Sequence, residues 1–215
     1  MALVPAAVFD HLIVAAATLE DGEDFVESRT GVRPQRGGKH VAMGTHNSLL
    51  NLGPGAYLEV IAIDPDGTAP PRPRWFELDR PAMQAQLRAS PRLVHWAART
   101  RDIDIVRRAC VVDPGPAHPM SRGEFHWRIT IPEDGHLPGG GILPTLVEWP
   151  DARHPTDAMP EARVHLGMMA ASHPEPNRMR TALAALGLGE TLQVTFGADI
   201  RLAAMLNTPR GRVTL

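Results

Sequence analysis

Short apolar stretches alternate with amphipathic ones along the chain, and one strand-then-helix order begins three times. The first occurrence runs from an apolar strand at 9–15 into a helix at 18–29. The second starts with a strand at 93–98 and continues into a helix that Asp102 could cap, and the third starts with a strand at 164–170. Such a recurrence predicts a chain assembled from repeated units.

Strand patterns, rather than another helix, follow each of these helices. In the first unit they cover 39–43, 45–52 and 56–63, and the last two flank Gly53-Pro54-Gly55, a turn sequence. Further strands are expected at 125–131, 143–149, 191–196, 199–206 and 212–215, with a connecting helix at 75–90. We therefore predict an α+β fold of βαβββ units at 8–66 and 90–150, with a partial third βα unit at 160–215, all within one domain spanning 1–215.

Composition and charge restrict the class of protein. The 215 residues are 43% hydrophobic and 21% charged, which is typical of a globular chain, and the net charge of −2 offers no basic surface for nucleic acid. No run of about 18 apolar residues is present, so no membrane span is expected. The single cysteine, Cys110, excludes an internal disulfide, and we expect a soluble cytoplasmic protein.

Histidines and glutamates recur at matching places in the first two units. His11 and His95 each lie in the opening strand of a unit, while Glu59 and Glu148 each lie in the closing strand. Alternation along 57–61 puts Glu59 on the face opposite Leu58 and Val60, away from the expected helices. Because a carboxylate in an apolar strand needs a partner, this pattern favours a site.

Three segments carry a resemblance to a known family. Asp10-His11-Leu12-Ile13-Val14, the stretch 44–50 and the stretch 55–65 resemble the vicinal oxygen chelate superfamily, and most closely its glyoxalase-like domain proteins (glyoxalase, bleomycin resistance and extradiol dioxygenase type). The likeness is good over 8–66, fair over 90–150 and loose beyond 160. It implies that the first and last strands of each unit are neighbours, and that two units pair into a cupped mixed sheet with helices on its outer face.

The resemblance also implies a site. His11, Glu59, His95 and Glu148 would converge on one divalent metal ion, chemically suited to nickel, zinc, cobalt, manganese or iron. The metal would hold two adjacent oxygens of a small molecule, and Glu59 or Glu148 would act as the catalytic base of an isomerase or lyase. Two other functions stay open, namely a metal-free protein that sequesters a small molecule and an extradiol-type dioxygenase.

Further candidates lie beside Glu59. A tight hairpin around Pro54-Gly55 would place Leu50 opposite Glu59, so that His46 shares the face of Glu59. His46 is therefore a candidate for substrate contact, as is Tyr57, which shares the face of Glu59 within its own strand. Asn47 and His40 belong to the same loop-and-strand region and are further candidates. A third class, a protein–protein module descended from an enzyme, would fill the cup with its own side chains. Two units in one chain could complete a site, so a monomer or a homodimer is expected.

Overall fold

The first two units of the chain form one curved sheet of eight strands. The computed structural model describes residues 6–150 and 153–215. The first unit consists of β1 (Val8–Ala15), α1 (Leu19–Thr30), β2 (Gln35–His40), β3 (Thr45–Asn51) and β4 (Tyr57–Ile63). After α2 (Pro81–Ala89), the second consists of β5 (Arg92–Arg99), α3 (Ile103–Ala109), β6 (Ala117–Arg122), β7 (Phe125–Thr130) and β8 (Thr145–Glu148).

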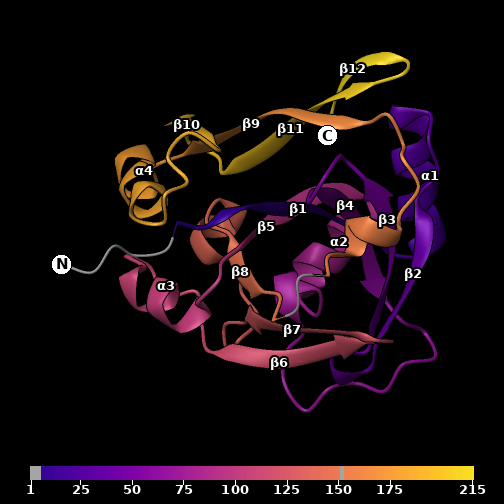
Figure 1. Cartoon of the computed structure of the whole chain (residues 1–215), viewed down its shortest axis with the longest axis horizontal. Coiled ribbons are helices and arrows are strands. Elements are labelled where there is room, and N and C mark those ends of the chain that lie inside the picture. Colours follow the sequence, from indigo (N-terminus) through magenta and orange to yellow (C-terminus); the bar gives the residue numbers. More distant parts are fainter. Residues whose placement is uncertain (1–5, 151–152) are drawn as a thin grey trace.

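The order of the strands follows the expected pairing of units. It runs β2-β3-β4-β1-β5-β8-β7-β6, and the opening strand of each unit lies parallel to its closing strand. β1 and β5 join the two units in antiparallel fashion. The sheet curves so strongly that its edge strands β2 and β6 approach each other, which nearly closes the cup (Figure 1). The α+β class, the βαβββ units and the cupped mixed sheet are thereby confirmed.

Local sequence explains how α1 is placed on the outer face of this sheet. Thr18 caps the helix by accepting a hydrogen bond from the backbone N–H of Asp21, and Gly31 ends it in the left-handed conformation with φ of 79°. Gly22 then allows close packing, because a Cβ at this position would lie 2.3 Å from Cγ1 of Val60 on β4. The helix buries Leu19 and Val26 against the apolar face of the sheet.

The last part of the chain forms a second sheet with a different plan. It consists of β9 (His165–His173), α4 (Pro176–Ala185), β10 (Gln193–Phe196), β11 (Arg201–Thr208) and β12 (Gly211–Thr214). Its order is β10-β9-β11-β12, so its opening strand lies parallel to the strand after the helix and not to its final strand. The third unit thus begins like the other two and ends as a βαβ crossover with a hairpin.

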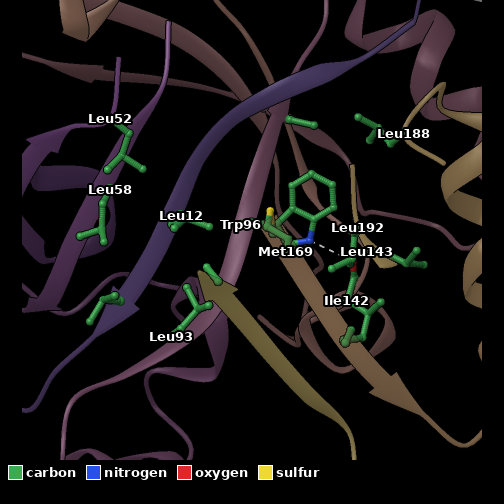
Figure 2. Packing of buried hydrophobic residues seen from close by; sticks show 14 of the residues in the cluster. Leu12, Leu52, Leu58, Leu93, Trp96, Ile142, Leu143, Met169, Leu188 and Leu192 are labelled. Carbon is green, nitrogen blue, oxygen red and sulfur yellow. Dashed lines mark hydrogen bonds between the residues drawn. The ribbon is translucent and has the colours of Figure 1, made fainter. Parts of the chain in front are cut away.

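Two apolar clusters lie on opposite faces of the large sheet. On the outer face, β1, β4 and β5 pack against the helices and the second sheet, with Trp96 fully buried among Met169, Leu188 and Leu192 (Figure 2). The Trp96 indole N–H donates to the carbonyl of Ile142 at 2.9 Å. On the inner face, the segment between the units contributes apolar side chains, and Met83 and Leu87 of α2 belong to one cluster with Ile13 of β1.

Three elements differ from those expected from the sequence. The strand expected at 39–43 ends at His40 and gives way to a 3-10 turn, and β6 arises in a proline-rich stretch where no strand is expected. The helix expected at 75–90 is broken. Only Pro81–Ala89 is α-helical, because Phe76 and Glu77 adopt left-handed φ angles of 58° and Pro81 occupies the first helical turn.

Candidate functional site

A buried carboxylate fixes the orientation of the histidine on β1. Asp10 is fully buried, and its Oδ1 lies 2.6 Å from Nδ1 of His11. The register between β1 and β5 shifts between Phe9 and His11, which is a bulge, and bulges re-aim side chains in this way. With Nδ1–H donating to Asp10, the Nε2 of His11 is left to face the inner side of the sheet.

Asp10 has further partners that keep it ionised. Its Oδ2 accepts from Nε1 of Trp149 at 3.0 Å and lies 3.2 Å from Nε2 of His154 and 3.6 Å from Nη1 of Arg99. Burial alone would raise the pKa of Asp10, but the hydrogen bonds from His11 and His154 hold it well below its usual value. The carboxylate is therefore a permanent negative charge behind His11 at neutral pH.

Glu59 stands on the pocket side of His11. Their strands are parallel neighbours, with His11 opposite Tyr57 and Ile13 opposite Glu59, so the two side chains meet diagonally. The Nε2 of His11 lies 3.7 Å from Oε2 of Glu59, and the His11 ring stacks on the Tyr57 ring with centroids 4.4 Å apart. Burial raises the pKa of Tyr57 well above its usual value, so it remains a neutral phenol.

The other oxygen of Glu59 is held by residues of β2 and β3. Nδ2 of Asn47 donates to Oε1 of Glu59 at 2.5 Å, and Nε2 of His40 lies 3.9 Å from the same oxygen. Burial lowers the pKa of His40 to about 4, so its ring is neutral at pH 7. Glu59 is thus oriented on one side and leaves Oε2 toward His11 and the pocket.

These groups form the polar floor of a pocket inside the cup. The space inside it that the centre of a water-sized molecule can occupy is about 30 Å³, and His11, His40, Tyr57 and Glu59 line it. The opposite walls are apolar, and they come from the segment between the units and from the second unit. These wall residues are Trp75, Phe76, Trp127, Ile129, Val147 and Trp149, with Arg122 beside them. The arrangement can hold the apolar part of a small ligand next to His11 and Glu59, two groups that can transfer protons.

Comparison with known proteins identifies the family. A family model described as a glyoxalase-like domain matches residues 9–187, which is most of the chain. The chain belongs to the glyoxalase-like domain family. With its cupped βαβββ sheet it is a member of the vicinal oxygen chelate superfamily, as the resemblance of the sequence indicated.

Comparison with solved structures also gives similar proteins. A crystal structure of a hypothetical protein from Staphylococcus aureus matches with a TM-score of 0.63 at 12% identity, covering 91% of this chain and 88% of that one. A methylmalonyl-CoA epimerase from Mycobacterium tuberculosis is similar with a TM-score of 0.44 at 18% identity, covering 69% and 92%. At these identities the likeness concerns the fold alone, and no curated protein matches the chain significantly.

The structure separates the two expected metal ligands of the second unit from those of the first. His95 faces the inner side, but its Nε2 accepts from the backbone N–H of Thr145 at 3.1 Å, and its Nδ1 lies 3.2 Å from the carbonyl of Gly141. Both ring nitrogens are therefore engaged, and burial lowers the pKa of His95 to about 3. His95 is a neutral histidine that ties the Gly139–Gly141 loop to β5 and β8.

Glu148 lies on the other face of the sheet. Its Oε2 accepts from the backbone N–H of Ile103, at the start of α3, at 2.8 Å, and it lies 3.5 Å from Nη1 of Arg128. Its neighbours Val147 and Trp149 line the pocket instead, as alternation requires. Within 6–150 and 153–215, no group of three or more histidine, cysteine or acidic side chains is placed to hold a metal ion.

The three expected substrate contacts also divide. The hairpin pairs Leu49 with Glu59, and not Leu50, because its loop runs from Leu52 to Ala56. A slip of one residue moves every side chain to the other face. Asn47 and Tyr57 consequently lie beside Glu59, whereas His46 faces the helix side near Leu19 and Arg36. The expected placement of His46 on the face of Glu59 was wrong.

Sequence reasoning missed several residues at this site. Asp10 was recognised only as part of a motif, although an acid directly before a strand histidine could have suggested an orienting partner. Trp75 and Phe76 come from a segment expected to be helical, and Arg122 comes from a strand that was not expected. No local pattern signals either contribution, because both depend on how the two units close around the cup.

Proposed function

We propose that this glyoxalase-like protein binds a small oxygenated molecule in the pocket and moves a proton on it, as an isomerase or lyase does. The observation that carries the proposal is the chain of contacts from Asp10 through His11 to Glu59, which ends in the pocket. Proton transfer at a carbon next to a carbonyl needs a proton acceptor and a proton donor that face the same ligand.

Each member of the chain has a separate task. Asp10 holds the Nδ1–H tautomer of His11 and would stabilise the imidazolium formed when Nε2 takes up a proton. Asn47 fixes Glu59 through Oε1, so Oε2 keeps a constant position beside His11. Glu59 would take a proton from the ligand's carbon on Oε2 and pass it to Nε2 of His11, and the imidazolium would then return it to the carbon or give it to an oxygen of the ligand. The aromatic walls exclude water from this exchange.

A divalent metal is implied by the superfamily, and the donors of this chain test that implication. His11 and Glu59 offer Nε2 and Oε2 on the pocket side, but both nitrogens of His95 are engaged and Glu148 lies on the opposite face. These donors do not fit the four-ligand set implied by the sequence resemblance. The proposed proton transfer therefore includes no step through a metal.

A second candidate is ligand binding without turnover. It is favoured by the apolar character of the second unit, which presents Val147 and Trp149 to the pocket where the superfamily resemblance places a ligand or base. Under this candidate His11 and Glu59 only hydrogen-bond the ligand. It requires no chemistry from Oε2 of Glu59.

The experiment is a screen of small carbonyl compounds, in which NMR and chiral chromatography detect their conversion. Wild type is compared with Glu59→Gln and His11→Gln, and Glu20→Gln is the control, because Glu20 is exposed on α1 and paired with Arg36. Conversion that falls about 100-fold or more in both site variants, but not in the control, supports the proposal. Binding with no conversion favours sequestration, and conversion that appears only after adding a divalent metal contradicts the metal-free mechanism.

A further inference from the structure

Arg122 spans the gap between the two edges of the curved sheet. It is the last residue of β6, and its side chain crosses Gly37 and Gly38 of β2. A Cβ at Gly38 would lie 3.0 Å from Cγ of Arg122, so only glycine leaves this path open without displacing the side chain. Nη1 of Arg122 then donates to Oδ1 of Asn47 at 3.1 Å. The guanidinium is therefore held in one place at the pocket.

No carboxylate among the described residues forms an ion pair with this guanidinium. In the part of the chain that the structure describes, the ion pairs include many arginines but not Arg122. Asn47, a neutral amide, stands between Arg122 and Glu59 and hydrogen-bonds both. A half-buried guanidinium with spare donors at a pocket is suited to an anion, above all a carboxylate or phosphate that accepts two hydrogen bonds.

Trp75, which lines the same pocket, carries a buried donor without a partner among the described residues. Trp75 is 4% exposed, and its indole Nε1 has no hydrogen-bond partner among the described residues. Its position is fixed by an unusual backbone, since Phe76 and Glu77 both have φ of 58° and the N–H of Glu77 donates to the carbonyl of Gly135 at 2.8 Å. Strained, well-anchored backbone of this kind is typical of ligand sites, and a buried N–H needs an acceptor.

The remaining surface limits the shape of the ligand. Trp127, Ile129 and Trp149 give the same pocket apolar and aromatic walls. We propose that the ligand is a compact, planar apolar carboxylate, with its anion on Arg122, a second oxygen on the indole N–H of Trp75 and its body between the aromatic walls. This inference rests on the proposed function and names its substrate class.

The test measures equilibrium binding of phenylacetate and of its neutral isostere phenylacetamide by calorimetric titration. Wild type is expected to bind the anion at least about tenfold more tightly than the amide, as a charge-assisted hydrogen bond implies. Arg122→Met should reduce this preference to about twofold or less. Arg128→Met is the matched control, because Arg128 lies on the next strand and pairs with Asp104 and Glu148 outside the pocket.

A second comparison tests Trp75. Phenylpyruvate, which carries an additional carbonyl oxygen, should bind wild type more tightly than phenylacetate does. In Trp75→Phe, the ratio of these two affinities should fall by a factor of about three to ten. Equal binding of acid and amide by wild type, a preference that survives in Arg122→Met, or no binding of any of the three probes would overturn the inference.

These outcomes remain separate from those of the proposed function, because phenylacetate and phenylacetamide are compared by binding alone. An anion preference without conversion of any carbonyl compound would leave the inference standing and contradict the proposed function. Conversion of neutral carbonyl compounds without any anion preference would do the reverse.

Discussion

Asp10 and His11 are consecutive residues of one strand whose side chains bond to each other, with Oδ1 of Asp10 2.6 Å from Nδ1 of His11. Consecutive side chains of a regular strand point to opposite faces, so this contact depends on the bulge opposite β5. The same carboxylate binds Trp149, directly after the last strand of the second unit, and lies 3.2 Å from Nε2 of His154, before the following 3-10 turn. One buried acid thus links the polar floor of the pocket to its aromatic wall.

Replacing Asp10 tests this link directly. Asp10→Asn keeps the shape but removes a buried charge that faces Arg99 and two histidines. We expect the free energy of unfolding to fall by about 2–4 kcal/mol. In ¹⁵N-histidine NMR, His11 should lose its single Nδ1–H tautomer. Trp149→Phe is the comparison, since it removes one bond to Asp10 and retains the charge. An unchanged tautomer in Asp10→Asn would refute the orienting role.

The two buried neutral histidines predict a loss of stability in acid. Burial lowers the pKa of His40 to about 4 and that of His95 to about 3, below the ordinary value of 6.5. Because the unfolded chain takes up these protons first, the native state is fully favoured above pH 6.5 and loses stability as the pH falls towards 4 and 3. The expected slope is about 1.4 kcal/mol per pH unit for each histidine.

Denaturant titrations at pH 7, 6, 5 and 4.5 measure this slope. His95→Gln removes one titrating group while an amide can still bond Thr145 and Gly141. The slope of the variant should be smaller than that of wild type by about 1.4 kcal/mol per pH unit. Asp10 does not contribute in this window, because its pKa is lowered and its effect is lost only below the ordinary carboxyl value of 3.8. A stability that is constant between pH 7 and 4.5 would contradict the burial of both rings.

Two glycines test the packing that positions β4 and therefore Glu59. Gly22→Ala would place a methyl group 2.3 Å from Cγ1 of Val60, and overpacking at such contacts costs about 1–3 kcal/mol. Gly189→Ala is the matched control, since its nearest neighbour would be an ordinary 3.8 Å away. Urea unfolding should show a clear loss for the first variant and a change within about 0.5 kcal/mol for the second. Equal midpoints would show that α1 does not pack this tightly.

Local pattern was sufficient for the fold and for the position of Glu59. Alternation in 57–61 places Glu59 and Tyr57 on the inner face, and Leu58 and Val60 contribute to the outer core as expected. Alternation depends on interactions within a few residues, which the periodicity of the sequence records directly. That β1 and β4 are neighbours was implied instead by the resemblance to the family, and the two strands do pair, in parallel.

Register and long-range contacts were beyond the reach of the sequence. The register of the hairpin differs by one residue from the expected one, so that Leu49 and not Leu50 lies opposite Glu59. This shift places Asn47 instead of His46 on the face of Glu59. His95 repeats the setting of His11 in the sequence. Its Nε2, however, accepts a hydrogen bond from the backbone N–H of Thr145, 50 residues away, and is therefore not free to bind a metal. Arg122 reaches the pocket only because the sheet curves until β2 and β6 meet. None of these contacts leaves a periodic signal.

The central claim is that Glu59 exchanges a proton with a ligand carbon, and solvent deuterium exchange measures it most directly. Ligands found by screening are incubated in D₂O with wild type, Glu59→Gln or the control Glu20→Gln, and loss of the carbon-bound proton signal is followed by NMR. The account predicts exchange with wild type and Glu20→Gln. In Glu59→Gln the exchange rate should be lower by a factor of about 100 or more, at similar ligand affinity. Bound ligands that gain no deuterium with wild type, or that gain it equally fast with Glu59→Gln, would contradict it.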